Sequence, residues 1–458
     1  MKKIARSTIL LLAILSLVGC TATIPEQTAS PAATVSIFDP TMVHEINISL
    51  ATVDWKATLD NPTAEEYYVA TINYDGIVAD NVGFRTKGNS SLRSVAQSDS
   101  ERYSYRIKLD KYDKSQTLEG VNEFVINNMY SDASYMREFL SYQIMGEFGL
   151  DVPEFAYVKV SINDEYQGLY LAVEAIDDSY IERQFGNNDG NLYKAEENAT
   201  LSPGSESKFD QKNGTDKSKS DLTALIAALD SLTSENTEQI EQVLNIESAL
   251  KMIAANAVLA NFDSYNGNFS HNYYLYNDNG ELVCLPWDLN MSIGGFGGSS
   301  PEGFDLYNPI SGNGGSQLPL ITKLLSAPEF KDQYKSYVSE LIMLLDDFDE
   351  RVKVLDELIN QYVKEDPTSF YTYDEYLTAI AYDPDYEFSN DQGMGNRVGG
   401  GVGGGRGQAP GVDFKPQEGQ APGMELRPQG MQMPSGGNVP IINVIKARVD
   451  YINNQLKE

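Results

Sequence analysis

Two aspartates, Asp263 and Asp288, flank a stretch whose pattern predicts a β-hairpin. Strands are expected at Tyr273–Tyr276 and Leu282–Leu285, with the turn-forming residues Asn277–Gly280 between them. Because a hairpin folds the chain back on itself, both carboxylates can reach the same end of it. In phosphoryl transfer, one aspartate accepts the proton of the attacking hydroxyl, while a second aspartate and an asparagine hold divalent metal on the phosphates.

The order of these groups along the chain is that of protein kinases, where a catalytic loop, a hairpin and a metal-binding aspartate follow one another. Kinases also carry an asparagine five positions after the catalytic aspartate, and Asn268 has that spacing from Asp263. Asn272, which opens the first strand, is a competing metal ligand. The alternative is that Asp263 and Asp288 are ordinary turn or cap residues.

The run NFDSYNGNFSHNYYLY at 261–276, followed by LPWDLN at 285–290, resembles the core signature of the CotH kinases, which are atypical secreted protein kinases of the spore coat protein H type. The resemblance implies transfer of phosphate from ATP, with Mg²⁺ or Mn²⁺, to Ser or Thr hydroxyls of a surface or coat protein. It implies that Asp263 acts on the hydroxyl and that Asp288 holds the metal. It favours Asn272 over Asn268 as the second metal ligand, because the family pattern has Asn before Tyr-Tyr-Leu-Tyr.

Two basic segments could meet the phosphates. The segment containing Arg85 and Lys87 resembles the "RxKGNSS" segment of the same family, and it is predicted to be a strand running into a loop with several small donors. Residues Tyr103–Asp110 alternate as a strand, with Lys108 and Arg106 on its polar face. Lys108 is our choice for the phosphate-pairing lysine that kinases carry on such a strand, and Arg106 is the close rival.

Two glutamates are further candidates for the nucleotide site. A helix is predicted over Ser131–Gly149, and its Glu138 could orient the strand lysine as a kinase helix glutamate does, although a surface position is the favoured interpretation. Glu174 ends a strand in a segment that resembles the family's linker, where the nucleotide base would dock. Alternatively, Glu174 caps the next helix.

The other elements must position these groups. Residues 35–82 show the alternation of short strands, and Asn198–Ser218 is polar enough to be an exposed loop. Helical spacing predicts helices at Ser220–Leu232, Glu235–Leu244 and Ile246–Leu259, the last of which leads into Asp263.

These patterns predict an α+β, two-lobed, protein-kinase-like fold. We expect a β-rich N-terminal lobe at 35–175 and a helical C-terminal lobe at 176–389. Residues 390–438 are rich in Gly, Pro and Met, which favours disorder, and 439–458 form a final helix.

The first 20 residues have the features of an export signal, with basic residues before a short apolar run. The run ends in Leu-Val-Gly-Cys, which resembles a bacterial lipobox, so Cys20 is the expected lipidation site and 21–34 a flexible tether. The protein is therefore expected outside the cytoplasm, anchored by lipid to a bacterial membrane.

Composition excludes several classes of function. The net charge of −32 argues against nucleic acid as a partner, because phosphates would be repelled. After Cys20 only Cys284 remains, which excludes a Cys-rich zinc site, and the two histidines provide little material for a His-based metal site. Two alternatives to protein phosphorylation stay open. The first is a non-catalytic kinase-like surface protein for adhesion or coat assembly, and the second is a kinase acting on a glycan or small molecule.

Overall fold

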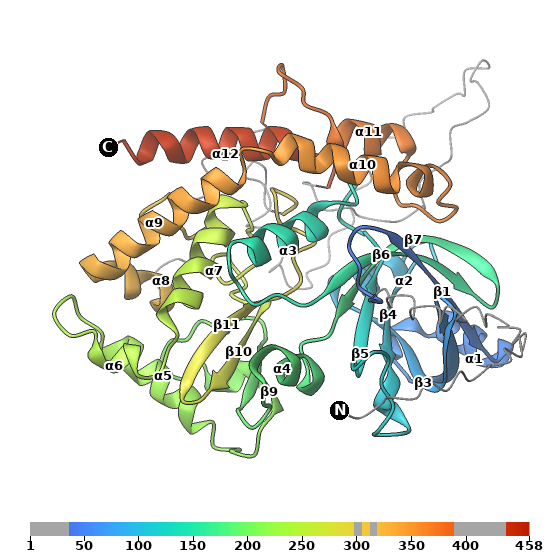
Figure 1. The fold of residues 1–458 in the computed structure, drawn as a ribbon, viewed down its shortest axis with the longest axis horizontal. Helices are drawn as coiled ribbons and strands as arrows, with labels where there is room; N and C mark the ends of the chain where they lie inside the picture. The colour runs from blue at the N-terminus through green and yellow to red at the C-terminus, as the bar shows by residue number, and fades with distance from the viewer. Residues whose placement is uncertain (1–35, 297–304, 312–317, 389–436, 458) are drawn as a thin grey trace, which may run out of the picture. The chain divides into compact units, whose positions relative to one another are not determined.

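The computed structural model describes residues 36–296, 305–311, 318–388 and 437–457. Within the compact unit that begins at Ile37, strands dominate the N-terminal region and helices the C-terminal region (Figure 1). The predicted α+β class is confirmed at this level. None of the helices in the described ranges is long and apolar enough to cross a membrane.

A closed β-barrel forms the N-terminal region, with the described strands in the order β1-β2-β3-β4-β5-β7-β6. The strands are β1 Val43–Leu50, β2 Tyr68–Tyr74, β3 Ile77–Lys87, β4 Ser104–Lys108, β5 Glu123–Asn127, β6 Phe155–Ile162 and β7 Glu165–Glu174. Neighbours are antiparallel except β1 and β6, which close the barrel in parallel. The alternation in β1 is confirmed, since His44, Ile46 and Ile48 are buried.

A second, antiparallel sheet has the order β11-β10-β8-β9. Its strands are β8 Leu192–Ala195, β9 Phe209–Asn213, β10 Tyr273–Asp278 and β11 Glu281–Pro286. The predicted hairpin is therefore confirmed, and its register pairs Tyr273 with Pro286 at the open end. This end of the hairpin is where Asn272 and Asp288 lie.

Helices cover the remaining described chain, and α7 lies at their centre. Every residue of α7 from Ser248 to Val258 is buried, and the helix packs on α9, α12 and β11 (Figure 1). The helices are α1 Thr52–Asp60, α2 Ser90–Ala96, α3 Arg137–Glu147, α4 Asp178–Phe185, α5 Ser220–Ser231, α6 Glu238–Glu241, α7 Ile246–Val258, α8 Pro319–Thr322, α9 Pro328–Leu344, α10 Phe348–Lys364, α11 Tyr373–Ile380 and α12 Ile441–Gln455. Short 3₁₀ helices occupy Pro62–Ala64, Leu109–Lys111, Glu206–Lys208 and Leu324–Ser326.

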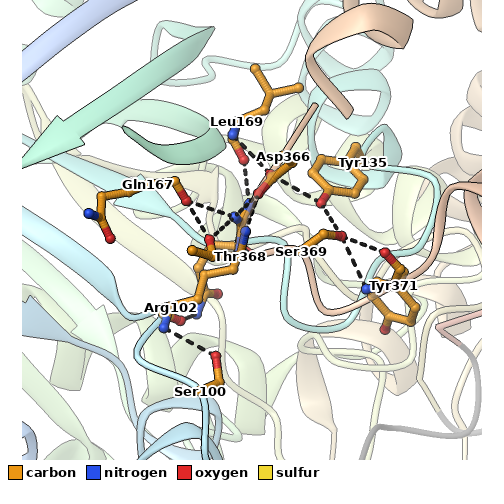
Figure 2. A network of polar contacts seen from close by, with 10 residues as sticks. Ser100, Arg102, Tyr135, Gln167, Leu169, Asp366, Thr368, Ser369 and Tyr371 are labelled. Carbon is orange, nitrogen blue, oxygen red and sulfur yellow. Dashed lines mark hydrogen bonds and ion pairs between the residues drawn. The ribbon is translucent and has the colours of Figure 1, made fainter. Parts of the chain in front are cut away.

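A buried ion pair joins the barrel to the segment after α10. Arg102, which precedes β4, donates from Nη1 to Oδ1 of Asp366 at 2.9 Å, and both side chains are inaccessible to solvent. Asp366 also accepts from the backbone N–H of Leu169 in β7 at 3.0 Å, as Figure 2 shows. The guanidinium lies over the ring of Tyr170 at 4.3 Å. The pair therefore fixes β7 and the end of α10 to each other.

Three predicted elements need correction. Residues 52–60 form a helix inside the region predicted as strands, with a Lys56–Asp60 ion pair of 2.5 Å along one face. The helix predicted from Ser131 begins at Arg137, because Asp132 folds the preceding residues into a turn and accepts the backbone N–H of Arg137 at 2.8 Å. The helix predicted over Glu235–Leu244 is only α6, since Leu244 pairs with Leu282 of β11 instead.

The segment Asn198–Ser218 is not simply an exposed loop. It contains β9, and Ala199, Leu201 and Phe209 within it are buried. Strands β5 and β8 lie where no strand was predicted. The segment 390–438, predicted to be disordered, lies outside the described residues apart from its last two.

Candidate active site

A cavity of about 890 Å³ opens between the barrel and the β10–β11 hairpin, and it collects most of the predicted site residues. The barrel contributes basic side chains together with Glu123 and Asn127, and the hairpin end contributes Asp263, Asn272 and Asp288. Of the predicted residues, those lining the cavity are Arg85, Lys87, Arg106, Lys108, Glu138, Asp263, Asn272 and Asp288. A cavity of this size is in the usual range for a small-molecule or cofactor site.

The hairpin end is fixed by hydrogen bonds between its own residues. The side-chain amide of Asn272 donates to the backbone carbonyl of Asp263 at 2.9 Å and to its Oδ2 at 3.2 Å. The carbonyl of Asn272 accepts the backbone N–H of Trp287 at 3.2 Å. Asn272 and Asp288 both have left-handed backbones, with φ of 58° and 56°. Non-glycine residues adopt this conformation when their surroundings hold them in it, and they often do so at functional sites.

Asp263 contacts a residue that the sequence did not single out for the site, His271. Its Nε2 lies 2.8 Å from Oδ1 of Asp263, and both side chains are mostly buried. Burial opposes the charged imidazole, but the hydrogen bond to Asp263 and the charges of Asp263 and Asp288 prevail and raise the pKa of His271 above its usual value. A carboxylate with an imidazole partner is thus available at the mouth of the hairpin.

Lys87, at the end of β3, is the cation placed next to both Glu138 and Asp288. Its amine donates to Oδ1 of Asn127 at 2.8 Å, and the amide of Asn127 donates to Glu138 at 2.9 and 3.1 Å. Burial lowers the pKa of Lys87, while Asp288 and Glu138 raise it in opposition. Burial and the charge of Asp288 raise the pKa of Glu138 to about 8, against the opposing effects of Lys87 and Asn127.

Glu138 is buried, with 2 % of its surface exposed, so the favoured interpretation of a surface glutamate is wrong. Its partner also differs from the predicted one. Lys108 and Arg106 both pair with Glu123 of β5, Lys108 at 2.7 Å from its Oε2. Because Glu123 engages these two cations, Glu138 does not orient either of them in this structure.

Two predicted site residues lie outside the cavity lining. Glu174 is buried and forms an ion pair with Arg183 of α4. The residues that follow it, Ala175 and Ile176, do line the cavity. Glu174 does not cap α4 either, because the side chain of Asp177 accepts the first backbone N–H groups of that helix. Asn268 is exposed and its side chain does not reach the cavity. Cys20 lies outside the described residues.

The residues present fit a phosphate-bearing ligand. Arg85 and Arg106 are directly opposite each other on β3 and β4, and both line the cavity, so two guanidinium groups lie side by side in its wall. Each has one carboxylate partner, Glu65 and Glu123 respectively. Within the described chain, Nε of both arginines is buried without a hydrogen-bond acceptor. These donors match the oxygen atoms of a phosphate chain.

The residues also fit a divalent cation that is shared with such a ligand. Among the residues described, no hydrogen bond or ion pair reaches the carboxylate of Asp288 or the side-chain oxygen of Asn272, although both residues line the cavity. Carboxylate and amide oxygens are preferred Mg²⁺ ligands. In the same ranges, no three His, Cys, Asp or Glu side chains gather to hold a metal ion unaided. Mg²⁺ is usually bound by one or two protein carboxylates together with waters and substrate phosphates, and Asp288 and Asn272 suit that kind of site.

Sequence reasoning missed Glu123, Asn127 and His271. Glu123 and Asn127 are the ends of β5, a strand that is buried along its whole length and lacks the alternation by which strands are recognised. His271 stands eight positions after Asp263, and the chain has only one other histidine. A rare histidine close in sequence to a candidate aspartate is the feature that could have identified it.

Fold and site together define an α+β protein with a cavity suited to a phosphate-bearing ligand and a shared divalent cation. The chain belongs to the CotH kinase protein family, whose model matches residues 84–392. It is 23% identical over 285 residues to the inner spore coat protein H of Bacillus subtilis (strain 168), a match that covers 59% of this chain and 75% of that protein.

Among solved structures, the chain is similar to one of Shewanella oneidensis MR-1, the toxin–antitoxin system of HipA and HipB with its operator DNA. The identity is 12%, the match covers 72% of this chain and 73% of that one, and the TM-score is 0.23. At this TM-score the likeness carries no argument about the present chain.

Proposed function

We propose that this protein is a two-lobed CotH-type kinase that transfers the γ-phosphoryl group of ATP to Ser or Thr hydroxyls of a surface or spore-coat protein. The observation that carries the proposal is that Asp263, Asn272, Asp288 and Lys87 all line the same cavity. Family membership supports the kinase class. The name of the B. subtilis relative supports a coat protein as the acceptor.

In this proposal, Asp263 accepts the proton of the acceptor hydroxyl. The hydroxyl oxygen then bonds to the γ-phosphorus of ATP, and ADP departs with the bridging oxygen. His271, in contact with Asp263, holds that carboxylate in place. Asp288 and Asn272 hold Mg²⁺ or Mn²⁺, which supplies positive charge to the phosphate oxygens. Lys87 and the arginine pair Arg85 and Arg106 bind the phosphate chain.

The base of the nucleotide would lie against Ala175 and Ile176, which line the cavity beyond the end of β7. The nucleotide base is thus still expected at the linker predicted from the sequence. The residues in contact with it are those after Glu174, and not the Glu174 side chain.

The direct test is phosphate incorporation into purified candidate coat proteins from labelled ATP with Mn²⁺, comparing wild type with Asp263→Asn. Loss of a general base typically costs roughly 10²–10⁴-fold in turnover. Asp278→Asn is the matched control, because Asp278 is at the turn end of the same hairpin and outside the cavity lining. Phosphoserine or phosphothreonine in the product supports the proposal. Equal incorporation by wild type and Asp263→Asn would contradict it.

We further propose that the protein is exported and held on the outer face of a bacterial membrane by a lipid on Cys20. The support is the basic start, short apolar run and Leu-Val-Gly-Cys sequence at the N-terminus. The substitution Cys20→Ser should move the protein from the membrane fraction to the medium. Unchanged membrane retention would refute the lipid anchor.

A further inference from the structure

Helix α3 contacts the backbone of the proposed metal ligand through a buried tyrosine. The hydroxyl of Tyr142 accepts a hydrogen bond from the backbone N–H of Asp288 at 3.0 Å. Tyr142 has no exposed surface, and its ring stacks on Phe155 of β6 at 5.5 Å between centroids. The ring that carries the hydroxyl is thus held by burial and by its stacking on Phe155.

This bond holds a backbone conformation that aspartate adopts at a cost. Asp288 has φ of 56°, a left-handed conformation that a non-glycine residue keeps only when its surroundings compensate for the strain. The preceding backbone N–H, that of Trp287, is bound to the carbonyl of Asn272. The Asp288 N–H is the next donor along the chain, and Tyr142 supplies its acceptor. Together the two bonds orient the peptide from which the Asp288 side chain extends into the cavity.

The same helix holds the residues after Asp288. The hydroxyl of Ser141 contacts that of Ser292, which in turn donates to the backbone carbonyl of Arg137 at 3.4 Å. One turn before Tyr142, Glu138 accepts from Asn127, which also accepts from Lys87. Helix α3 therefore contacts both the Asp288 segment and, through Glu138 and Asn127, the residues that hold Lys87.

We propose that Tyr142 is a positioning residue for metal binding: its hydroxyl fixes the backbone of Asp288 so that the carboxylate is presented to a divalent cation bound with nucleotide phosphates. The inference rests on the proposed function and deepens it. It predicts that removal of one buried hydroxyl, on a residue outside the cavity lining, weakens the binding of metal with nucleotide.

The test compares Tyr142→Phe with Tyr157→Phe by calorimetric titration of ATP at a series of Mn²⁺ concentrations. Tyr157 is a matched control, because it is equally buried, stacks on Phe139 of α3, and donates one hydrogen bond to the carbonyl of Tyr135 at 2.8 Å. Each variant removes one buried hydroxyl and keeps the ring, so both should lose a similar amount of thermal stability. Only Tyr142→Phe removes a contact with Asp288.

We expect Tyr142→Phe to require about 10-fold more Mn²⁺ for half-maximal ATP binding, the lower end of the usual effect of altering a residue that orients a metal ligand. Tyr157→Phe should bind as wild type does. If both variants bind Mn²⁺ and ATP as tightly as wild type, the role of Tyr142 is refuted while the proposed function stands. If wild type binds no ATP with any Mn²⁺ concentration, the proposed function fails and the inference fails with it.

Discussion

The imidazole of His271 lies against the carboxylate of Asp263, with Nε2 2.8 Å from Oδ1. The contact joins two residues of one loop at the open end of the hairpin, and it places an imidazole beside the proposed general base. His271 does not need to contact the nucleotide to affect the reaction, because it can act through the orientation and charge of Asp263.

Replacement of His271 should therefore reduce turnover without weakening ATP binding. A hydrogen bond to a charged group is worth about 1.5–3 kcal/mol, so His271→Ala should reduce turnover about 10- to 100-fold. The measurement is a steady-state rate together with a calorimetric Kd for ATP with Mn²⁺. A loss of ATP affinity equal to the loss of rate would place His271 in the nucleotide site instead.

The two candidate lysines can be separated by affinity. Lys87 lies beside Asp288 and Glu138, whereas Lys108 is held by Glu123 at 2.7 Å and by Asp110 at 3.0 Å. Lys87→Met should raise the Kd for ATP with Mn²⁺ by about 10-fold or more, the effect of losing one charge-assisted hydrogen bond. Lys108→Met should have a smaller effect. The reverse order would restore the lysine chosen from the sequence.

The parts of the site that have a local sequence pattern could be predicted, and the contacts between distant segments could not. The hairpin and the helix before Asp263 have local patterns of their own, and both appear where the sequence predicts them. The partners of the cations could not be predicted, because they depend on β5. That strand is buried throughout, shows no alternation, and pairs with β4 and β7 only when the barrel closes.

Asp132 shows a second limit. Its side chain can cap a helix, and the sequence predicts a helix start at Ser131, one position before it. The same carboxylate also accepts from the backbone and side chain of Ser134 and from Arg137, so it folds a turn first and the helix begins later. A local signal of this kind marks a helix start to within a few residues and does not fix it.

The pKa of Glu138 predicts a pH dependence of stability in the absence of metal. The folded protein holds the pKa near 8, and unfolding returns it to the ordinary 4.5. Between these values the folded state keeps a proton that the unfolded state has lost, so stability falls as pH rises from about 4.5 to about 8. The slope from this group approaches about 1.4 kcal/mol per pH unit.

Glu138→Gln should remove this part of the slope, because glutamine stays neutral and can still accept from Asn127. The slope is measured by urea unfolding at several pH values in the presence of a metal chelator. Burial raises the pKa of Glu174 to about 7, against Arg183, so Glu174→Gln should flatten the profile over a window that ends one pH unit lower. Parallel profiles for wild type and Glu138→Gln would contradict the assigned pKa.

The buried pair of Arg102 and Asp366 should be a large contributor to stability (Figure 2). Asp366→Ala leaves the guanidinium buried without its charge partner, which typically costs about 3–5 kcal/mol. Asp60→Ala is the control, since it breaks the exposed Lys56–Asp60 pair, and such pairs are usually worth under about 1 kcal/mol. Similar losses in urea unfolding for the two variants would show that the buried pair does not hold β7 to α10.

The central claim is that the cavity binds nucleotide with a metal held by Asp288, while Asp263 serves the acceptor. Titration of ATP with Mn²⁺ into wild type, Asp288→Asn and Asp263→Asn tests it most directly. We expect wild type and Asp263→Asn to bind with similar affinity and Asp288→Asn to bind at least about 10-fold more weakly. Equal affinity in all three proteins would contradict the assignment of Asp288, and no binding by wild type would contradict the account as a whole.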